Sequence, residues 1–438
     1  MAKTGLTKIS SRPKLYLTIE GGKDLGYIFE RFEWQAMTNG GYIVRGKVRD
    51  SYWNVLREFA TQDKYLDRGR RIPTKVVWEL EWPGADRTGK HLGYLVDVRA
   101  NGINTGGGFE FVAVDPPSYW LNAGDSSGEV YEGSVKEVIE QVIQRYFIEP
   151  NRSVVEEGGR VEVSETLDNV KNKWYMMRMD PKTFIGSLLD WASSVTGNKT
   201  NFIVSSDGNL ENEVPVIWVK EQAARNPIDY GSWVFDTNAP GGHDGMNFEF
   251  LANTFISVFQ RQLITGGISA TTEKYIDRIT DAGRTFAHVY DENTSSKKNV
   301  NIDERKGFKK PQGPPGSFEK PHEWSTSVLA IPEHNAGDLG LRYQDYIDGR
   351  ARGMFLNMLN LVMRLKVRVT GETSRDLANA HNLGVSKMKL LWIDADFQPF
   401  FLGGDWLVYG FHHIMTRGEW FTDLYLARLD YDASAVKV

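Results

Sequence analysis

The sequence contains no cysteine, which excludes disulfide bonds, thiolate metal sites and cysteine nucleophiles. It also has no excess of basic residues, because 52 lysines and arginines stand against 57 aspartates and glutamates, a net charge of −5. This balance disfavours a protein whose main task is to bind nucleic acid phosphates. Long hydrophobic runs are lacking as well: Asn357, Asn360 and Arg364 interrupt the most apolar stretch. We therefore expect neither a membrane span nor a signal peptide.

The common motifs of enzyme chemistry are also missing. There is no Gly-x-Gly-x-x-Gly after a strand, no Gly-x-x-x-x-Gly-Lys-Ser/Thr, no His-Glu-x-x-His and no nucleophile elbow. Glycoside hydrolysis needs two carboxylates, and Glu79 and Glu81 lie two residues apart. They alternate with Trp78 and Leu80, however, so the pattern predicts the solvent face of a strand. We expect no enzyme activity and no cofactor.

The only histidine pair is His412–His413. Adjacent residues of a strand point to opposite faces of the sheet, so the two rings are poorly placed to hold one metal ion. We predict that one of them is packed in the sheet with its ring hydrogen-bonded, and we expect no metal site.

What the sequence does contain is an ordinary globular composition over 438 residues, with 41% hydrophobic and 25% charged residues. At about 150 residues per domain, this length suggests roughly three domains. Residues 1–122 are predicted to be β-rich, because apolar and polar residues alternate along 15–19, 42–48, 76–82 and 92–98. One helix is predicted at 51–60.

Residues 123–235 are predicted to form a helical or mixed domain. Ser134 and Glu137 match a capping box in front of an apolar helical stripe. Asp180 followed by Pro181 predicts a second helix start. Residues 202–204 and 214–220, with a turn at 207–209 between them, predict a β-hairpin.

A second β-rich block is predicted for residues 236–265 together with 336–438. The expected strands lie at 361–370, 388–393, 405–410, 411–416 and 420–429, and a long helix at 341–358 precedes them. Residues 266–335, between the two parts, contain Ser-, Lys-, Pro- and Gly-rich segments and are predicted to be an irregular arm.

Basic residues gather in this arm. Seven basic and three acidic residues lie between 296 and 320. This pattern fits an arm that docks on an acidic neighbouring protein, and it also fits contact with phosphates, although only Phe308 and Phe318 are available for base stacking. The interface candidates are these arm residues and three cations of the strand at 361–370: Lys297, Lys298, Arg305, Lys306, Lys309, Lys310, Arg364, Lys366 and Arg368.

The C-terminal block carries a recognisable arrangement. A strand ending in Val-Thr-Gly (365–372, LKVRVTGE) is followed by a Gly-Asp turn (403–410, GGDWLVYG), a strand with His413, and a hairpin with a last strand (417–426, RGEWFTDLYL). This arrangement resembles the baseplate hub proteins of contractile-tailed phages, which are related to late control D proteins and to the N-terminal half of type VI secretion spike proteins. The order of β block, helical insert and β block agrees with that family along most of the chain.

The resemblance implies a β-dominated α+β fold with two tail-tube-type β-barrel domains, 1–122 and 236–265 plus 336–438, a helical or mixed insert domain at 123–235 and an inserted arm at 266–335. It implies a homotrimer in the virion, made in the host cytoplasm, that joins the sixfold tail tube to a threefold central spike. Its partners would be the tail tube protein, the spike protein and other baseplate (wedge or adaptor) proteins, with DNA only passing through its channel.

Two other functions remain open from the sequence. One is a tail-associated enzyme that degrades peptidoglycan with the carboxylates named above. The other is a glycan-binding virion protein that uses exposed tryptophans, of which the chain has 13. Aromatic residues are also enriched at large permanent interfaces, which favours the hub.

Overall fold

The computed structural model describes the larger part of the chain between Lys14 and Arg428. The described residues are 14–20, 22–50, 72–81, 90–101, 107–122, 127–168, 171–177, 179–195, 202–207, 214–221, 228–236, 247–250, 271–276, 285–290, 325–329, 363–370, 383–384, 386–393, 404–418 and 420–428. The helices predicted at 51–60 and 341–358 lie outside them. Within the described parts, no helix is long and apolar enough to cross a membrane.

Six strands near the N-terminus form one half of a large sheet, which we call the N-terminal unit: β1 (Lys14–Ile19), β2 (Phe29–Met37), β3 (Gly41–Arg49), β4 (Lys75–Glu81), β5 (His91–Asn101) and β6 (Gly108–Val114). Buried apolar side chains alternate with more exposed ones, as Leu15, Leu17 and Ile19 show in β1. The predicted strands at β1, β3, β4 and β5 are confirmed, whereas the prediction missed β2 and β6.

Helices and short strands follow: α2 (Pro116–Asn122), β7 (Ser127–Ser134), α3 (Val135–Ile143), the π-helix η1 (Gln144–Ile148), α4 (Glu149–Asn151), β8 (Arg160–Val163), the 3-10 helix η2 (Glu165–Asp168), β9 (Lys171–Met177), α5 (Pro181–Val195), β10 (Phe202–Asp207) and β11 (Val216–Glu221). The predicted hairpin is confirmed as the antiparallel pair β10 and β11, and β8 adds to it in parallel. The two predicted helix starts are confirmed at α3 and α5.

The capping box stabilises the start of α3. The Ser134 hydroxyl accepts a hydrogen bond from the Glu137 backbone amide at 3.2 Å, and the Glu137 carboxylate accepts one from the Ser134 amide at 2.8 Å. Val138, Ile139 and Val142 then enter the core with no exposed area. These residues belong to a continuous apolar cluster that joins α3 and α5 to Leu92 and Tyr94 of β5.

Replacing Ser134 by alanine is expected to lower the free energy of unfolding by about 1 kcal/mol, because one amide of the first turn then lacks its acceptor. Thermal unfolding measures the change. Ser153→Ala is the matched control, since its exposed hydroxyl binds only the carbonyl of Pro150. Equal effects of the two substitutions would contradict the role of the cap.

Asn151 ties the helices to the N-terminal unit. It is completely buried, and its side-chain oxygen accepts hydrogen bonds from the Tyr94 hydroxyl on β5 and from the Trp120 indole of α2, the latter at 3.2 Å. Its amide nitrogen donates to the carbonyl of Gly158. Burial raises the pKa of Tyr94, so this hydroxyl stays protonated and remains a donor.

Six strands in the rest of the chain form the other half of the large sheet, which we call the C-terminal unit: β12 (Ile228–Asp236), β13 (Asn247–Phe250), β17 (Met363–Thr370), β18 (Ser386–Ile393), β19 (Gly404–Thr416) and β20 (Trp420–Arg428). The predicted C-terminal strands are confirmed, except that the two strands expected at 405–410 and 411–416 are one continuous strand, β19. The pattern missed β12, which spans the domain boundary predicted at residues 235 and 236.

The region predicted to be an irregular arm also contains strands. β14 (Thr271–Ile276), β15 (Thr285–Tyr290) and β16 (Ser325–Leu329) form a three-stranded sheet. The prediction is wrong at these strands because it followed the Lys-, Pro- and Gly-rich segments of the region. β14 and β15 themselves are rich in the β-branched and aromatic residues that favour strands. Residues 296–320 lie outside the described residues.

The two units repeat one strand order. In the N-terminal unit the spatial order is β1-β4-β5-β6-β3-β2, and in the C-terminal unit it is β12-β18-β19-β20-β17-β13. If the six strands of each unit are numbered by their order along the chain, their order across the sheet is 1-4-5-6-3-2 in both units. One pairing differs in direction, since β1 and β4 are antiparallel whereas β12 and β18 are parallel. The predicted similarity of the two β blocks thus holds at the level of topology.

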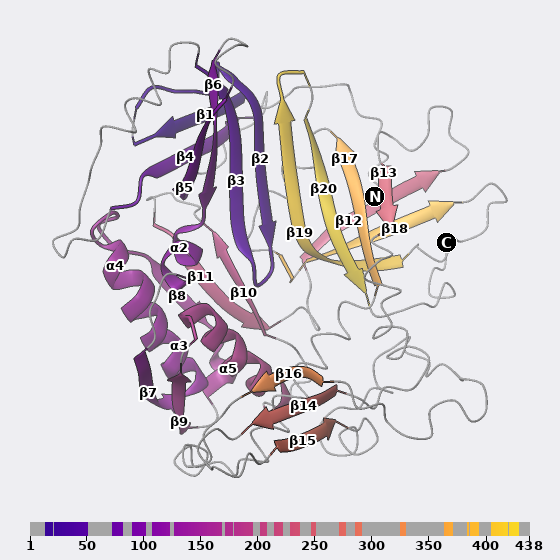
Figure 1. Ribbon diagram of the computed structural model, residues 1–438. Helices are drawn as coiled ribbons and strands as arrows, with labels where there is room; N and C mark the ends of the chain where they lie inside the picture. The colour runs from indigo at the N-terminus through magenta and orange to yellow at the C-terminus, as the bar shows by residue number, and fades with distance from the viewer. Residues whose placement is uncertain are drawn as a thin grey trace.

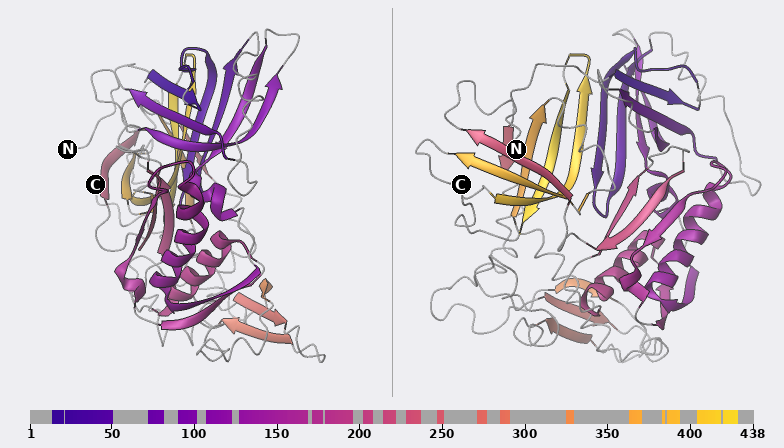
Figure 2. Two further views of the ribbon diagram at one scale, coloured as in Figure 1. Left: turned by 90° about the vertical axis from the view of Figure 1, so that its left-hand side faces the viewer. Right: turned by 180° about the vertical axis from the view of Figure 1, so that it is seen from behind.

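The units lie side by side and share one 12-stranded sheet, because β2 pairs with β19 (Figure 1). The helices α3 and α5 lie below the N-terminal unit, as the side and rear views also show (Figure 2).

Candidate assembly interface

The pairing of β2 with β19 joins the two units. It is antiparallel and runs from Arg31 opposite Thr416 to Met37 opposite Gly410. The Thr38 amide extends the ladder by donating to the Tyr409 carbonyl at 3.0 Å. A β-carbon at Gly410 would stand 3.0 Å from the Ala36 carbonyl oxygen, so this position keeps β2 close only because it has no side chain.

A cluster of buried rings lies under this junction. Trp34 of β2 has no exposed area, and its ring centre lies 5.1 Å from that of Phe411 and 5.4 Å from that of His413, both on β19. On the other side it lies 4.4 Å from His91 and 5.7 Å from Trp78. Trp34 therefore packs against both units at once.

The two adjacent histidines point to opposite faces, as predicted. His413 is 2% exposed, and its Nδ1 lies 2.7 Å from the Thr422 hydroxyl of β20. His412 lies on the more polar face, with its Nε2 3.1 Å from the Glu33 carboxylate of β2. Among the described residues, no group of three or more acidic or histidine side chains could hold a metal ion.

The histidines make the junction sensitive to acid. Burial lowers the pKa of His413 to about 3, with smaller contributions from His412 and His91, and burial also lowers the pKa of His412. An unfolded histidine takes up its proton near pH 6.5. Below that pH the unfolded chain binds more protons than the folded chain, so the free energy of unfolding falls as the pH drops from about 6.5 toward 3.

We expect a urea titration series between pH 7.5 and 5.5, where most carboxylates stay ionised, to show this loss of stability. His413→Gln is expected to flatten the dependence, because glutamine does not titrate. An unchanged slope in the variant would contradict the assignment to His413.

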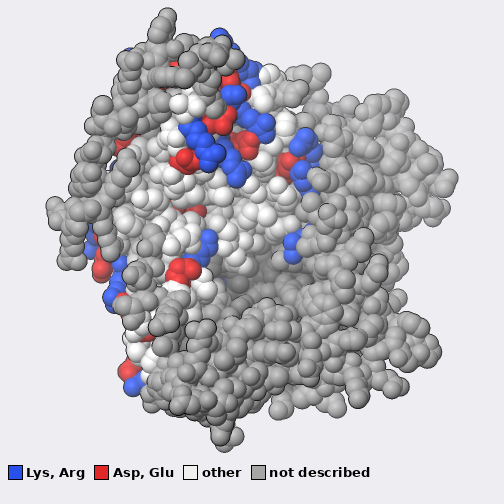
Figure 3. Space-filling view, in the orientation of Figure 1, with Lys and Arg blue, Asp and Glu red and all other residues white. Residues whose placement is uncertain are grey.

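The opposite face of the junction is polar and carries charges of both signs (Figure 3). Glu33 contacts Arg31 and lies 4.0 Å from Arg45. On the C-terminal unit, Asp423 is only 1% exposed and is held by Arg368 through two hydrogen bonds of 2.6 and 2.9 Å. Carboxylates thus offset cations along this face.

The structure places three of the sequence-predicted interface residues on β17. Lys366 lies 3.4 Å from Asp423, Arg368 binds the same carboxylate, and Arg364 is half-buried opposite Ala427 of β20. The role of the three in an interface with another protein stays a prediction. The other six candidates (Lys297, Lys298, Arg305, Lys306, Lys309 and Lys310) lie outside the described residues.

The carboxylates considered for catalysis lie on the more exposed face of β4, as predicted. Trp78 and Leu80 are buried between Glu79 and Glu81, and the Tyr16 hydroxyl donates to Glu81 at 2.5 Å. This predicted solvent face is therefore confirmed.

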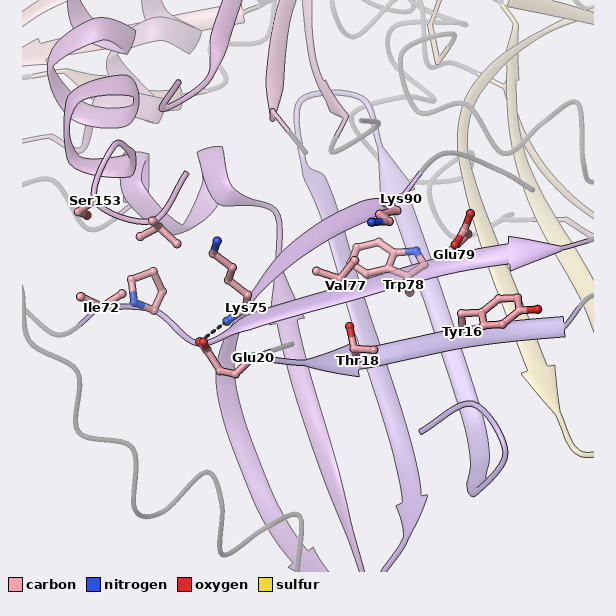
Figure 4. A pocket seen from close by; sticks show the side chains of 12 residues that line it. Tyr16, Thr18, Glu20, Ile72, Lys75, Val77, Trp78, Glu79, Lys90 and Ser153 are labelled. Atoms are coloured by element: carbon pink, nitrogen blue, oxygen red, sulfur yellow. Dashed lines mark hydrogen bonds between the residues drawn. The ribbon is translucent and has the colours of Figure 1, made fainter. Parts of the chain in front are cut away.

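A hollow of about 580 Å³ lies beside β1 and β4 (Figure 4). Its two carboxylates, Glu20 and Glu79, lie toward opposite ends, and Glu20 accepts a hydrogen bond of 2.8 Å from the Lys75 amide. The hollow therefore does not bring two carboxylates together around a substrate.

Comparison with solved structures identifies the fold. The tail protein from Neisseria meningitidis MC58 has a TM-score of 0.50 and 9% sequence identity, with 94% of this chain and 96% of that chain covered. The 43 kDa tail protein of prophage MuSo2 from Shewanella oneidensis has a TM-score of 0.51 and 12% identity, with 96% and 99% covered. This chain has the fold of phage tail proteins. The resemblance drawn from the sequence is confirmed at this level.

A component of the type VI secretion system from E. coli is also similar, with a TM-score of 0.44, 8% identity, and 94% of this chain and 76% of that chain covered. No family model matches the sequence, and no curated protein matches it.

The sequence pattern predicted the strand that holds His413 but did not predict its partner strand, β2. Phe32, Trp34 and Ala36 of β2 alternate as buried residues and could have marked this strand of the tail-protein fold. Glu30 and Arg31 interrupt the pattern, because the pairing of β2 with β3 shifts by one residue between Phe29 and Arg31.

Proposed function

We propose that this protein is the trimeric hub of a phage tail baseplate, which joins a sixfold tail tube to a threefold central spike. The observation that carries the proposal is the repetition of one strand order in two units that share a continuous sheet. A chain with two similar units presents six similar units when three copies assemble around one axis. Such a ring can contact a sixfold tube on one side and a threefold spike on the other.

The polar face of the large sheet is proposed to line the DNA channel of this ring. A channel wall should not hold phosphates, so its cations need nearby carboxylates. The contacts of Glu33, Asp423 and Glu110 with arginine and lysine residues meet this condition, for Glu110 with Lys47 at 3.9 Å. DNA would then pass through without lasting attachment.

The remaining partners follow from this placement. The tail tube protein would bind one end of the ring and the central spike protein the other, and the domain of α3 and α5 would contact wedge or adaptor proteins of the baseplate. The protein would be made in the host cytoplasm and function in the virion. The likeness to two phage tail proteins supports this location.

Electron microscopy of the purified protein tests the proposal. In end-on class averages of negatively stained particles we expect a ring of six similar lobes with threefold symmetry. Averages with three lobes, or with an open chain of subunits, would show that the two units of one chain do not act as equivalent parts of a ring.

A further inference from the structure

We propose that β13 of one copy pairs antiparallel with the second half of β5 in the next copy, with Glu249 opposite Asn101 and Phe250 opposite Ala100. This inference rests on the proposed ring. It names the two strand edges that close the ring and the register in which they meet.

A β-bulge aligns the two units residue by residue. In the N-terminal unit the pairing of β5 with β6 shifts by one residue between Leu95 and Asp97. In the C-terminal unit the pairing of β19 with β20 shifts in the same way between Val408 and Gly410. Matching the two bulges gives paired residues of β5, β6, β3 and β2 counterparts on β19, β20, β17 and β13.

Two ion pairs, one in each unit, support this alignment independently of the bulges. The matched bulges make Lys47 the counterpart of Arg368, and Glu110 the counterpart of Asp423. Both pairs are ion pairs, with distances of 3.9 Å between Lys47 and Glu110 and 2.6 Å between Arg368 and Asp423. The same charge pattern therefore occupies the same place in each unit.

The alignment also matches the edge strands β2 and β13. Glu33 of β2 lies opposite Arg45 of β3, and Glu249 of β13 lies opposite Lys366 of β17. Arg45 and Lys366 are themselves counterparts, so Glu249 occupies the register position that Glu33 has at the junction within the chain. β13 thus repeats the acidic residue with which β2 meets His412.

β2 pairs with β19, and the counterpart of β19 in the N-terminal unit is β5, whose second half has an open edge among the described strands. β19 pairs with β18 as far as Val408, and its residues 410–416 pair with β2 instead. β5 pairs with β4 as far as Tyr94, and among the described strands its residues 97–101 pair only with β6. β13, at the other end of the sheet, pairs only with β17 among the described strands.

The edge of β5 is more exposed than the matching edge of β19, which is covered by β2. This is the difference expected if β5 lacks a neighbouring strand. His413 of β19 is 2% exposed beneath β2, whereas its counterpart Ala100 on β5 is exposed. Val96, the bulged residue of β5, is 49% exposed although it is apolar, whereas its counterpart Tyr409 on β19 is 7% exposed. Unpaired edges of this kind favour association with another strand.

Charge fits the same register. Arg99 is the counterpart of His412; its side chain is 76% exposed and donates a hydrogen bond of 2.7 Å to the Asp97 carboxylate on the same strand. With Glu249 opposite Asn101, Arg99 and Glu249 take the diagonal positions that His412 and Glu33 hold at 3.1 Å within the chain. An acidic strand edge therefore meets a basic position in the neighbouring copy.

The natural absence of cysteine allows a direct test by disulfide cross-linking. Directly opposite residues of antiparallel strands have Cα atoms about 4.5–5.5 Å apart, which is within the range for a disulfide. We expect the full chain with Asn101→Cys and Glu249→Cys to form, after oxidation, covalent species of two and three chains that reducing agent reverses. Each single-cysteine variant should give no covalent trimer.

Two matched pairs control for register. Val96→Cys with Glu249→Cys shifts one partner by five residues, or about 17 Å along β5, and should not form the trimer. Glu33 and Ile414 are the counterparts of Glu249 and Asn101 and lie opposite each other within one chain. Glu33→Cys with Ile414→Cys should therefore form a disulfide inside each chain and join no chains. Equal trimer formation by the shifted pair would overturn the proposed register.

The mass of the same sample before oxidation separates the two proposals. If the variant with Asn101→Cys and Glu249→Cys assembles as three chains but does not cross-link, the proposed interface is overturned and the hub proposal stands. A sample without any three-chain assembly would overturn both.

Discussion

Replacing Trp34 by alanine is expected to lower the free energy of unfolding by about 3–5 kcal/mol, the usual range for removing a large aromatic side chain from a core. The reason is its position: Trp34 is fully buried and contacts rings of both units, from His91 to His413. Because the cavity would lie under the β2–β19 junction, we expect both units to lose stability together. Urea titration followed by circular dichroism measures the change.

Tyr27→Ala is the control for this experiment, since Tyr27 is 73% exposed and its loss should change the free energy of unfolding by less than about 0.5 kcal/mol. A loss below about 1 kcal/mol for Trp34→Ala would mean that the junction does not form part of the core. Two separate transitions in the natural protein would mean that the units fold independently.

Replacing Arg368 by methionine is expected to cost about 2–4 kcal/mol, because it leaves the buried Asp423 carboxylate without its two-pronged partner. Lys366, 3.4 Å away, offsets part of the loss. The substitution also removes the contact of the guanidinium with the Phe421 ring, 3.9 Å from the ring centre. Chemical denaturation of the variant at neutral pH gives the value.

Lys47→Met is the matched control, because Lys47 is the counterpart of Arg368 on the other unit and its side chain is 45% exposed, 3.9 Å from the similarly exposed Glu110 carboxylate. An exposed pair of this kind contributes about 0–1 kcal/mol. If the two substitutions cost the same, Asp423 does not depend on Arg368. Adding Asp423→Asn to Arg368→Met should recover part of the loss, since the buried charge is then gone.

Much of the fold could be predicted from local pattern. Strand β1 alternates without interruption, with Leu15, Leu17 and Ile19 buried, and the capping box at Ser134 identifies the start of α3. Strand β2 could not be found in this way, because its bulge places Glu30 and Arg31 side by side and breaks the period of two. The parallel pairing of β8 with β11 joins distant segments and leaves no local pattern.

The candidate site was predictable only in part. Alternation alone showed that His412 and His413 face opposite sides, and the structure confirms it. The partner of His412 is Glu33, 379 residues away in the sequence, and no periodicity indicates which strand lies beside which. The resemblance to hub proteins predicts two similar units, but their strand order and register depend on contacts between distant segments that only the structure shows.

The mass of the assembled protein in solution tests most directly whether three copies of a twofold-repeated chain form the ring. Mass photometry across a dilution series should show a dominant species of three times the 49.7 kDa chain mass. Arg99→Glu should shift that species toward single chains, and adding Glu249→Arg should restore it. A species of one, two or four chains at every concentration would contradict the account.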